Sequence, residues 1–154
     1  MVAHLSMLLA PVVAAALFVG NSIAANIDRE EHKCLALSLY WEAKAEGREG
    51  MIAVGSVVLN RVEHPDFPNT VCGVVHAGGE SPPCQFAYWC DGKSDQPKEQ
   101  EAWRLAQEIA AEMLTARPRD PTGGALFFHA AGIKVPWTIK RERTVKIGRH
   151  VYYR

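Results

Sequence analysis

The sequence lacks a charge imbalance, because its 17 Lys and Arg residues are matched by 17 Asp and Glu residues. An excess of positive charge is what draws a protein to nucleic acid or to an anionic membrane surface. Neither partner class is therefore indicated. Internal repeats and low-complexity tracts are also missing, and 154 residues of which 48% are apolar suffice for one domain with its own core.

Charged residues are absent from the first 25 positions, where Met7 to Gly20 is an almost unbroken apolar run. Small residues follow at the two positions that a signal peptidase reads. We expect residues 1–24 to be a signal peptide and residues 25–154 to be an exported domain, in the periplasm or at the cell wall. Because only the amino terminus and His4 supply positive charge before the run, an uncleaved N-terminal anchor is the alternative.

The four cysteines show no Cys-x-x-Cys spacing, and no paired histidines accompany them, so a zinc site is only the weaker alternative. Thiols in an oxidising compartment tend to pair, and two disulfides are expected. Four cysteines allow three connectivities. Spacing favours Cys84 with Cys90 as a small loop clip, which leaves Cys34 to connect the first helix to Cys72.

Apolar periodicity predicts three helices. The first begins at Asp28, which precedes Glu31 as in a capping box, and is expected to run to about Ala45. The second covers residues 49–62 and is apolar around most of its circumference, which favours burial on nearly all sides, although its valines also admit a strand. Gly55 would let a neighbouring element approach it closely.

The third helix is expected over residues 94–116, capped by Ser94 or Asp95 with Pro97 in its first turn. Before it lies a long segment, residues 63–95, that is rich in Pro, Gly and Cys and has one helical turn at 70–75. Loops of this length in a compact domain are usually functional.

The end of the chain reads as β-structure. Residues 125–129 and 144–153 are expected to pair in a small antiparallel sheet, with Gly148 at a turn or bulge. The predicted fold class is therefore α+β and mostly helical.

Glu42 shares a helical stripe with Leu35 and Leu39, so its carboxyl group is expected to be partly buried. Burial raises a carboxyl pKa, and Glu46 one turn further on is expected to add like-charge repulsion. A carboxyl group that stays protonated near neutral pH can protonate a glycosidic oxygen. The alternative is a structural carboxylate that pairs with Arg61.

Several blocks of sequence that match the pattern of a known family follow one another over nearly all of the chain after residue 32. They are YWEAKAEG at 40–47, NRV at 60–62, FPNTVCGVV at 67–75, CQF at 84–86 with CDG at 90–92, FHA at 128–130 and IGRHVYY at 147–153. Together they resemble the SleB/CwlJ-type cell-wall hydrolases, which include the spore cortex-lytic enzymes.

The resemblance implies a lysozyme-like domain that acts on peptidoglycan, with Glu42 as the catalytic acid. Family members with an assigned reaction behave as lytic transglycosylases, which cleave between MurNAc and GlcNAc with one carboxylic acid. A hydrolytic muramidase or glucosaminidase needs a second, correctly spaced carboxylate and is the alternative. No metal or organic cofactor is implied, and a monomer with peptidoglycan as its partner is expected.

Five further residues fall in the family blocks and are candidate substrate contacts: Glu46, Gln85, Phe86, His129 and Tyr153. The first four have a structural alternative. Glu46 can be purely structural, the residues at 85 and 86 can pack a disulfide-bounded loop, and His129 can be a hydrogen-bonded sheet residue.

Two rival functions remain. Lys44-Ala45 stands where the family usually has Arg-Gly, which keeps open a non-catalytic wall-binding module. A peptidase acting on the stem peptides would use Cys34 as nucleophile with His129 or His150 as base. Cys34 lies about a turn and a half inside its predicted helix, which is late for activation by the helix N-terminus.

Overall fold

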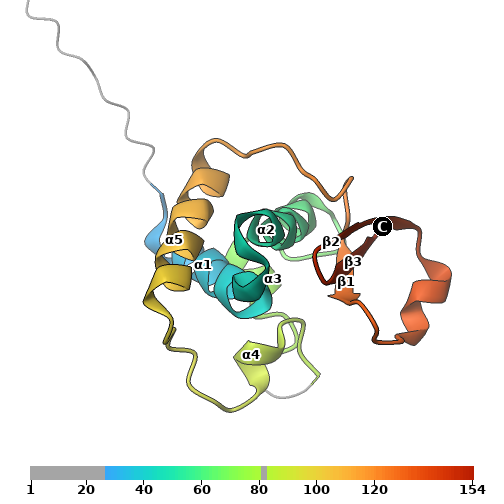
Figure 1. Cartoon of the computed structure of the whole chain (residues 1–154), viewed down its shortest axis with the longest axis horizontal. Helices are drawn as coiled ribbons and strands as arrows, with labels where there is room; N and C mark the ends of the chain where they lie inside the picture. Colours follow the sequence, from blue (N-terminus) through green and yellow to red (C-terminus); the bar gives the residue numbers. More distant parts are fainter. Residues whose placement is uncertain (1–26, 81–82) are drawn as a thin grey trace, which may run out of the picture.

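The computed structural model describes residues 27–80 and 83–154, and the expected signal peptide lies outside the described residues. The three longest helices gather on one side of the molecule, and a small sheet lies on the other (Figure 1). In chain order the elements are α1 Arg29–Ala43, η1 Lys44–Glu46, α2 Gly47–Glu63, α3 Val71–Val75, α4 Ala87–Cys90, α5 Gln100–Thr115, β1 Phe127–Ala130, η2 Pro136–Lys140, β2 Arg143–Ile147 and β3 His150–Tyr153. The predicted α+β class, mostly helical with a sheet near the C-terminus, is confirmed.

Helix α1 starts as predicted and ends slightly earlier. The Asp28 carboxylate accepts hydrogen bonds from the backbone N–H groups of Glu30 and Glu31, at 2.8 Å and 3.2 Å, which satisfies amides that the first turn leaves free. At the other end η1 continues from α1, and Gly47 then adopts a positive φ of 65°. This left-handed glycine turns the chain sharply into α2.

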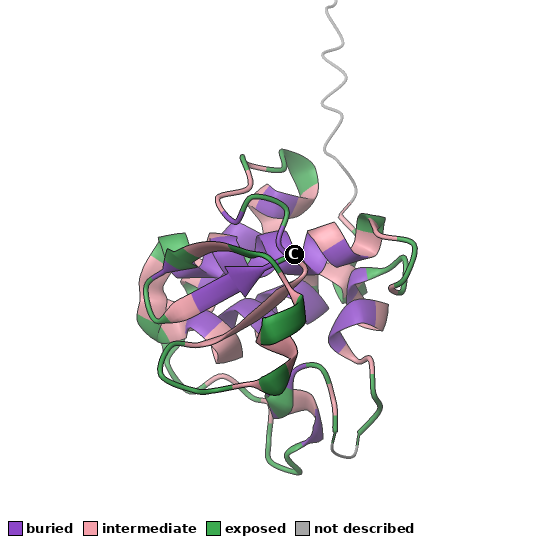
Figure 2. Cartoon of the chain, turned by 90° about the vertical axis from the view of Figure 1, so that its right-hand side faces the viewer, coloured by how far each residue is buried: buried purple, intermediate pink, exposed green. Residues whose placement is uncertain are grey.

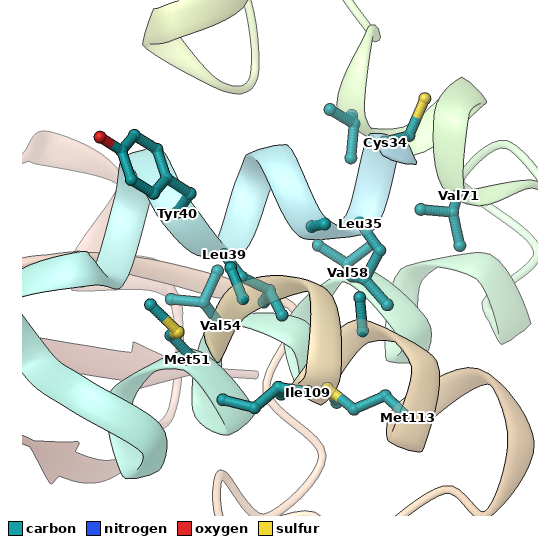
Figure 3. Packing of buried hydrophobic residues seen from close by; sticks show 14 of the residues in the cluster. Cys34, Leu35, Leu39, Tyr40, Met51, Val54, Val58, Val71, Ile109 and Met113 are labelled. Atoms are coloured by element: carbon teal, nitrogen blue, oxygen red, sulfur yellow. The ribbon is translucent and has the colours of Figure 1, made fainter. Parts of the chain in front are cut away.

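Helix α2 lies at the centre of the core, as predicted, and the strand alternative is wrong. Buried residues of α1, α2 and α5 interlock there, and they include Leu35, Leu39, Val54, Val58, Ile109 and Met113 (Figure 3). A Cβ added to Gly55 would lie 2.4 Å from Met113 Sδ and 3.1 Å from Leu39 Cδ2. The expected close approach at Gly55 is therefore confirmed.

Helix α5 begins at Gln100, so the expected cap at Ser94 or Asp95 and the first-turn position of Pro97 are wrong. Side chains of α1 hold the preceding segment in an extended form. The Tyr40 hydroxyl accepts hydrogen bonds from the N–H groups of residues 98 and 99, at 3.0 Å and 3.1 Å. Trp41 Nε1 also donates to the carbonyl of Asp95 at 3.1 Å. These long-range bonds replace the helical ones that local sequence would favour.

The sheet has the order β1-β3-β2, and both pairings are antiparallel. Gly148, with φ at 53°, forms the turn between β2 and β3, as expected for a turn at this position. A second small core joins the sheet to α2 and contains Ala53, Val57, Ala125, Ile147 and Tyr152. Buried residues therefore continue from the helices into the sheet, while the surrounding loops are exposed (Figure 2).

Both disulfides form with the expected partners. Cys34–Cys72 joins α1 to α3, and Cys84–Cys90 closes the loop around α4. No free cysteine remains, so the reading of Cys34 as a peptidase nucleophile is wrong.

In residues 27–80 and 83–154, no group of three or more His, Cys, Asp or Glu side chains lies close enough together to hold a metal ion. The helices found over that same part of the chain are each too short or too polar to span a bilayer.

The two disulfides should differ in their effect on stability because they close loops of different length. The sequence separations are 38 residues for Cys34–Cys72 and 6 residues for Cys84–Cys90. Loop-closure entropy predicts that Cys34→Ala/Cys72→Ala lowers the free energy of unfolding by about 4 kcal/mol, against about 2 kcal/mol for Cys84→Ala/Cys90→Ala. Urea denaturation at neutral pH measures both. Equal losses would contradict this ranking.

Candidate active site

Glu42 lies in the last turn of α1, at the boundary between two surface hollows. The first hollow, of about 550 Å³, and the second, of about 530 Å³, share Glu42, Ala130 and His150 as lining residues. One wall of each hollow comes from the helical side; the other comes from β1, η2 and the start of β3 in the first hollow, and from the end of β1 and the β2–β3 hairpin in the second. The two hollows together form a groove with the Glu42 carboxyl group at its midpoint.

The Glu42 side chain is partly buried, and burial raises its pKa to about 7. No cation or hydrogen-bond donor among the described residues contributes to this pKa. The expected repulsion from Glu46 does not contribute either, so that part of the prediction is wrong. The alternative in which Glu42 is a structural carboxylate paired with Arg61 is also wrong, because Arg61 donates to a backbone carbonyl and to Gln85 instead. Loss of water alone therefore raises the pKa of this carboxyl group enough for a large share of it to be protonated near neutral pH.

Glu46 lies in η1, after α1 has ended, and its carboxylate is bound by Arg149. Its two carboxylate oxygens accept hydrogen bonds from Arg149, one from the backbone N–H at 2.9 Å and one from Nε at 2.6 Å. These bonds lower the pKa of Glu46, whose side chain is only 7% exposed. Gly148 has a positive φ of 53°, and a Cβ there would clash with the Glu46 carboxylate, so both the backbone and the ion pair favour glycine. Glu46 lines the second hollow and fastens the β2–β3 turn to η1; its contact with substrate stays a prediction.

Arg61 is buried at the far side of the first hollow, with 5% of its surface exposed. Its Nε donates to the Leu126 carbonyl at 2.7 Å, and Nη1 donates to Gln85 Oε1 at 3.2 Å. The helix-one carboxylate expected beside it is absent. Gln85 is exposed and lines the hollow, where Arg61 fixes the orientation of its amide, and its contact with a sugar stays a prediction.

Phe86 does not reach the groove. Its side chain is 1% exposed and belongs to the main core, so the prediction that its ring contacts a sugar is wrong. Phe86 is the residue before the short helix α4, and its ring points inward to the helical core. The same family block therefore contains one groove residue and one core residue.

His129 lines the first hollow, and Tyr153 stands behind it. His129 Nδ1 lies 2.9 Å from the Ala130 carbonyl, and Nε2 lies 3.0 Å from the Tyr153 hydroxyl. Because a carbonyl oxygen only accepts, Nδ1 carries the proton and Nε2 accepts from Tyr153. Tyr153 is 8% exposed and lines a different hollow, so its predicted contact in the groove is not supported and it instead orients His129.

The groove residues that the site prediction did not include as substrate contacts comprise Trp137, Arg141 and His150, the last considered only as a peptidase base. Burial lowers the pKa of His150, which lines both hollows. The other two come from η2 and the residue after it, in a stretch with no clear helical or strand periodicity. The basic residues and the tryptophan of that stretch are the only sequence feature that could have indicated its place in the groove.

These features define the class: a small α+β domain that carries one carboxyl group of raised pKa at the middle of an open groove. The sequence profile of the Cell Wall Hydrolase family matches residues 45–153. The chain belongs to this family, which confirms the resemblance found in the sequence. Glu42 lies just before the matched segment, and its assignment therefore depends on its position in the groove.

Two curated relatives are spore cortex-lytic enzymes. That of Bacillus subtilis strain 168 is 31% identical over 86% of this chain and 41% of its own length, and that of Bacillus cereus strain ATCC 14579 is 30% identical over 86% and 48%. This chain thus spans less than half of each. A solved structure, the catalytic domain of the germination-specific lytic transglycosylase SleB from Bacillus anthracis, is 27% identical with a TM-score of 0.65, over 86% of this chain and 100% of that one.

Burial of Glu42 should make stability depend on pH. A carboxyl group whose folded pKa is raised to about 7 contributes stability that is fully present below its ordinary value near 4.5 and is lost as pH rises through 7. Glu42→Gln removes this loss. Relative to wild type, the variant should gain about 1–3 kcal/mol in free energy of unfolding between pH 4 and pH 8.

Urea denaturation of both proteins at pH 4, 6 and 8 measures this difference. Glu49→Gln, the same substitution at an exposed position in the first turn of α2, controls for the loss of one negative charge. If wild type and Glu42→Gln show parallel pH profiles, the Glu42 carboxyl group is not desolvated.

Proposed function

We propose that this domain cleaves the glycan strands of peptidoglycan between MurNAc and GlcNAc, as a lytic transglycosylase with Glu42 as its only acid. The observation that carries the proposal is the position of a carboxyl group with a pKa of about 7 at the midpoint of a two-part groove. A strand that fills both hollows would place sugars on either side of the acid. The solved catalytic domain that this chain resembles is titled a lytic transglycosylase.

The reaction needs Glu42 in two protonation states. As an acid it donates its proton to the glycosidic oxygen while the bond to the MurNAc anomeric carbon breaks. As a carboxylate it then accepts the proton of the MurNAc C6 hydroxyl, whose oxygen bonds to the same anomeric carbon. The product is a 1,6-anhydro sugar, and the original Glu42 acid is restored.

The carboxylates along the groove favour this reaction over hydrolysis. Among the described lining residues of the two hollows, Glu46 is the other carboxylate, and Arg149 holds both of its oxygens. An inverting or retaining glycosidase uses a second carboxylate to activate water or to attack the sugar. The muramidase and glucosaminidase alternatives therefore lack the partner that they require.

Lys44-Ala45 differs from the Arg-Gly that the family usually has, and this difference is the reason to consider a non-catalytic wall-binding module. It leaves the Glu42 acid in place. Lys44 Nζ lies 2.6 Å from Glu99 Oε1 and 5.2 Å from the centroid of the Trp41 ring. It therefore contacts the start of α5 and an aromatic ring, and it does not alter the pKa of Glu42. This arrangement supports the catalytic reading.

We further propose that residues 1–24 direct export, as a signal peptide or an anchor, and that residues 25–154 act as a monomer in the periplasm or at the cell wall. Both the cell wall substrate of the family and the two disulfides fit an oxidising compartment outside the cytoplasm.

Glu42→Gln should abolish strand cleavage, since it keeps the volume of the side chain but removes the proton. We expect at least a thousandfold loss of kcat, measured as release of soluble muropeptides from purified peptidoglycan. Glu49→Gln is the matched control and should retain wild-type activity. Equal activity of wild type and Glu42→Gln would refute the mechanism.

The wild-type rate should fall as pH rises above about 7, because the acid then loses its proton.

Mass spectrometry of the products tests the second half of the reaction. Anhydro ends are lighter than reducing ends by one water, so a product set with reducing ends only would assign the protein as a hydrolase.

A further inference from the structure

The first hollow carries two guanidinium groups and no carboxylate other than Glu42. Arg61 and Arg141 line it together with His129 and His150. Burial raises the pKa of Glu42 to about 7, so below that pH its carboxyl group is mostly uncharged and the two arginine charges have no full counter-charge among the described lining residues of the hollow. Within the described part of the chain, neither arginine forms an ion pair with an acidic residue.

Arg61 is the unusual member of this pair. A guanidinium that is 5% exposed normally has a carboxylate beside it, because an unpaired charge loses its hydration on burial. Here burial lowers the pKa of Arg61 to about 10, so the group remains charged. Two of its donors are used by Leu126 and Gln85, and its remaining N–H groups have no acceptor among the described residues.

Arg61 and Arg141 both lie near the ring of Phe127. The Cζ atom of Arg141 is 3.8 Å from the Phe127 ring centroid, and that of Arg61 is 5.6 Å from it. Arg141 Nη1 donates to the Trp137 carbonyl at 3.2 Å, which fixes the guanidinium at the hollow. Two like charges held against one ring repel each other, and an anion between them would offset that repulsion.

The second hollow differs in this respect. It also contains basic residues, but Lys44 is paired with Glu99, and Arg149 is paired with Glu46. Lys146 also lines this hollow without an ion pair, but it is exposed and keeps its hydration. The unmatched positive charge that is shielded from water therefore lies in the first hollow, on Arg61 and Arg141.

We propose that Arg61 and Arg141 bind a carboxylate carried by the muramic acid residue of the strand, and thereby determine which strands are cleaved and in which direction they lie. A planar guanidinium matches a carboxylate in geometry, and the pairing is stronger where water is partly excluded. GlcNAc carries no carboxylate, so the arginine side of the groove would select MurNAc. This proposal deepens the proposed function and rests on it for the identity of the strand.

The carboxylate can come from two sources, which share this chemistry. One is the lactyl group of a residue that has lost its stem peptide, and the other is the stem peptide itself. Three tetrasaccharides of alternating GlcNAc and MurNAc separate them: one with free lactyl carboxylates, one with lactyl methylamides, and one with stem peptides attached.

Binding is measured by calorimetry with the Glu42→Gln protein, so that nothing is cleaved. At least one carboxylate-bearing tetrasaccharide should bind about tenfold or more tightly than the methylamide, and which one does so identifies the source. Arg141→Gln in the same background should remove that difference while leaving methylamide binding unchanged. A structural role of Arg141 would instead weaken all three ligands alike.

Arg143→Gln is the matched control, since Arg143 is exposed and lines neither hollow. Arg61→Lys provides a second variant that keeps the charge but loses the planar fork, and it should reduce the preference for the carboxylate. Equal affinity for the charged and neutral tetrasaccharides, in the Glu42→Gln protein, would overturn the proposal.

Cleavage assays keep this proposal separate from the proposed function. If wild type cuts the methylamide and the carboxylate-bearing strands at equal kcat/KM, the anion site is wrong but the glycan-cleaving activity stands. If it cuts none of them while Glu42→Gln still binds the carboxylate form through Arg141, the activity is wrong and the anion site stands.

Discussion

The carboxyl group of Glu42 is held where water is partly excluded and where no cation or donor offsets the loss. The charged residues nearby in the described part of the chain are bound to other partners, so that none of them pairs with this carboxyl group. Glu46 lies in η1 and is bound by Arg149, and Arg61 is held at the first hollow by hydrogen bonds to a carbonyl and an amide. A carboxylate-arginine pair at Glu42 would lower its pKa and end its use as an acid at neutral pH.

The two walls of the groove come from two parts of the chain that are stabilised in different ways. The helical wall is stabilised by a continuous apolar core and by the Cys34–Cys72 disulfide. The opposite wall is a three-stranded sheet of short strands, which is joined to α2 by a much smaller set of buried residues. Arg61 connects the two, because it belongs to α2 and donates to the carbonyl just before β1.

Local patterns predicted the features that local physics controls. The Asp28 cap, the buried faces of α1 and α2 and the partial burial of Glu42 all follow from spacing along the chain, and the short Cys84–Cys90 loop follows from proximity. The start of α5 could not be predicted, because Tyr40 supplies hydrogen bonds from 58 residues away. The Glu46–Arg149 pair spans 103 residues, and nothing near Glu46 in the sequence indicates it. Family blocks likewise marked Phe86 without showing that its ring faces the core.

The small side chain of Ala53 has a consequence for the shape of the cleft. Ala53 is fully buried between α2 and the sheet. It acts as a spacer, because the volume at this position determines how near the two walls stand to each other. A relative with a larger residue at this position would therefore have a wider cleft. The width of the cleft limits the size of the substituents on the sugar chain, although a residue at position 53 would not touch the ligand.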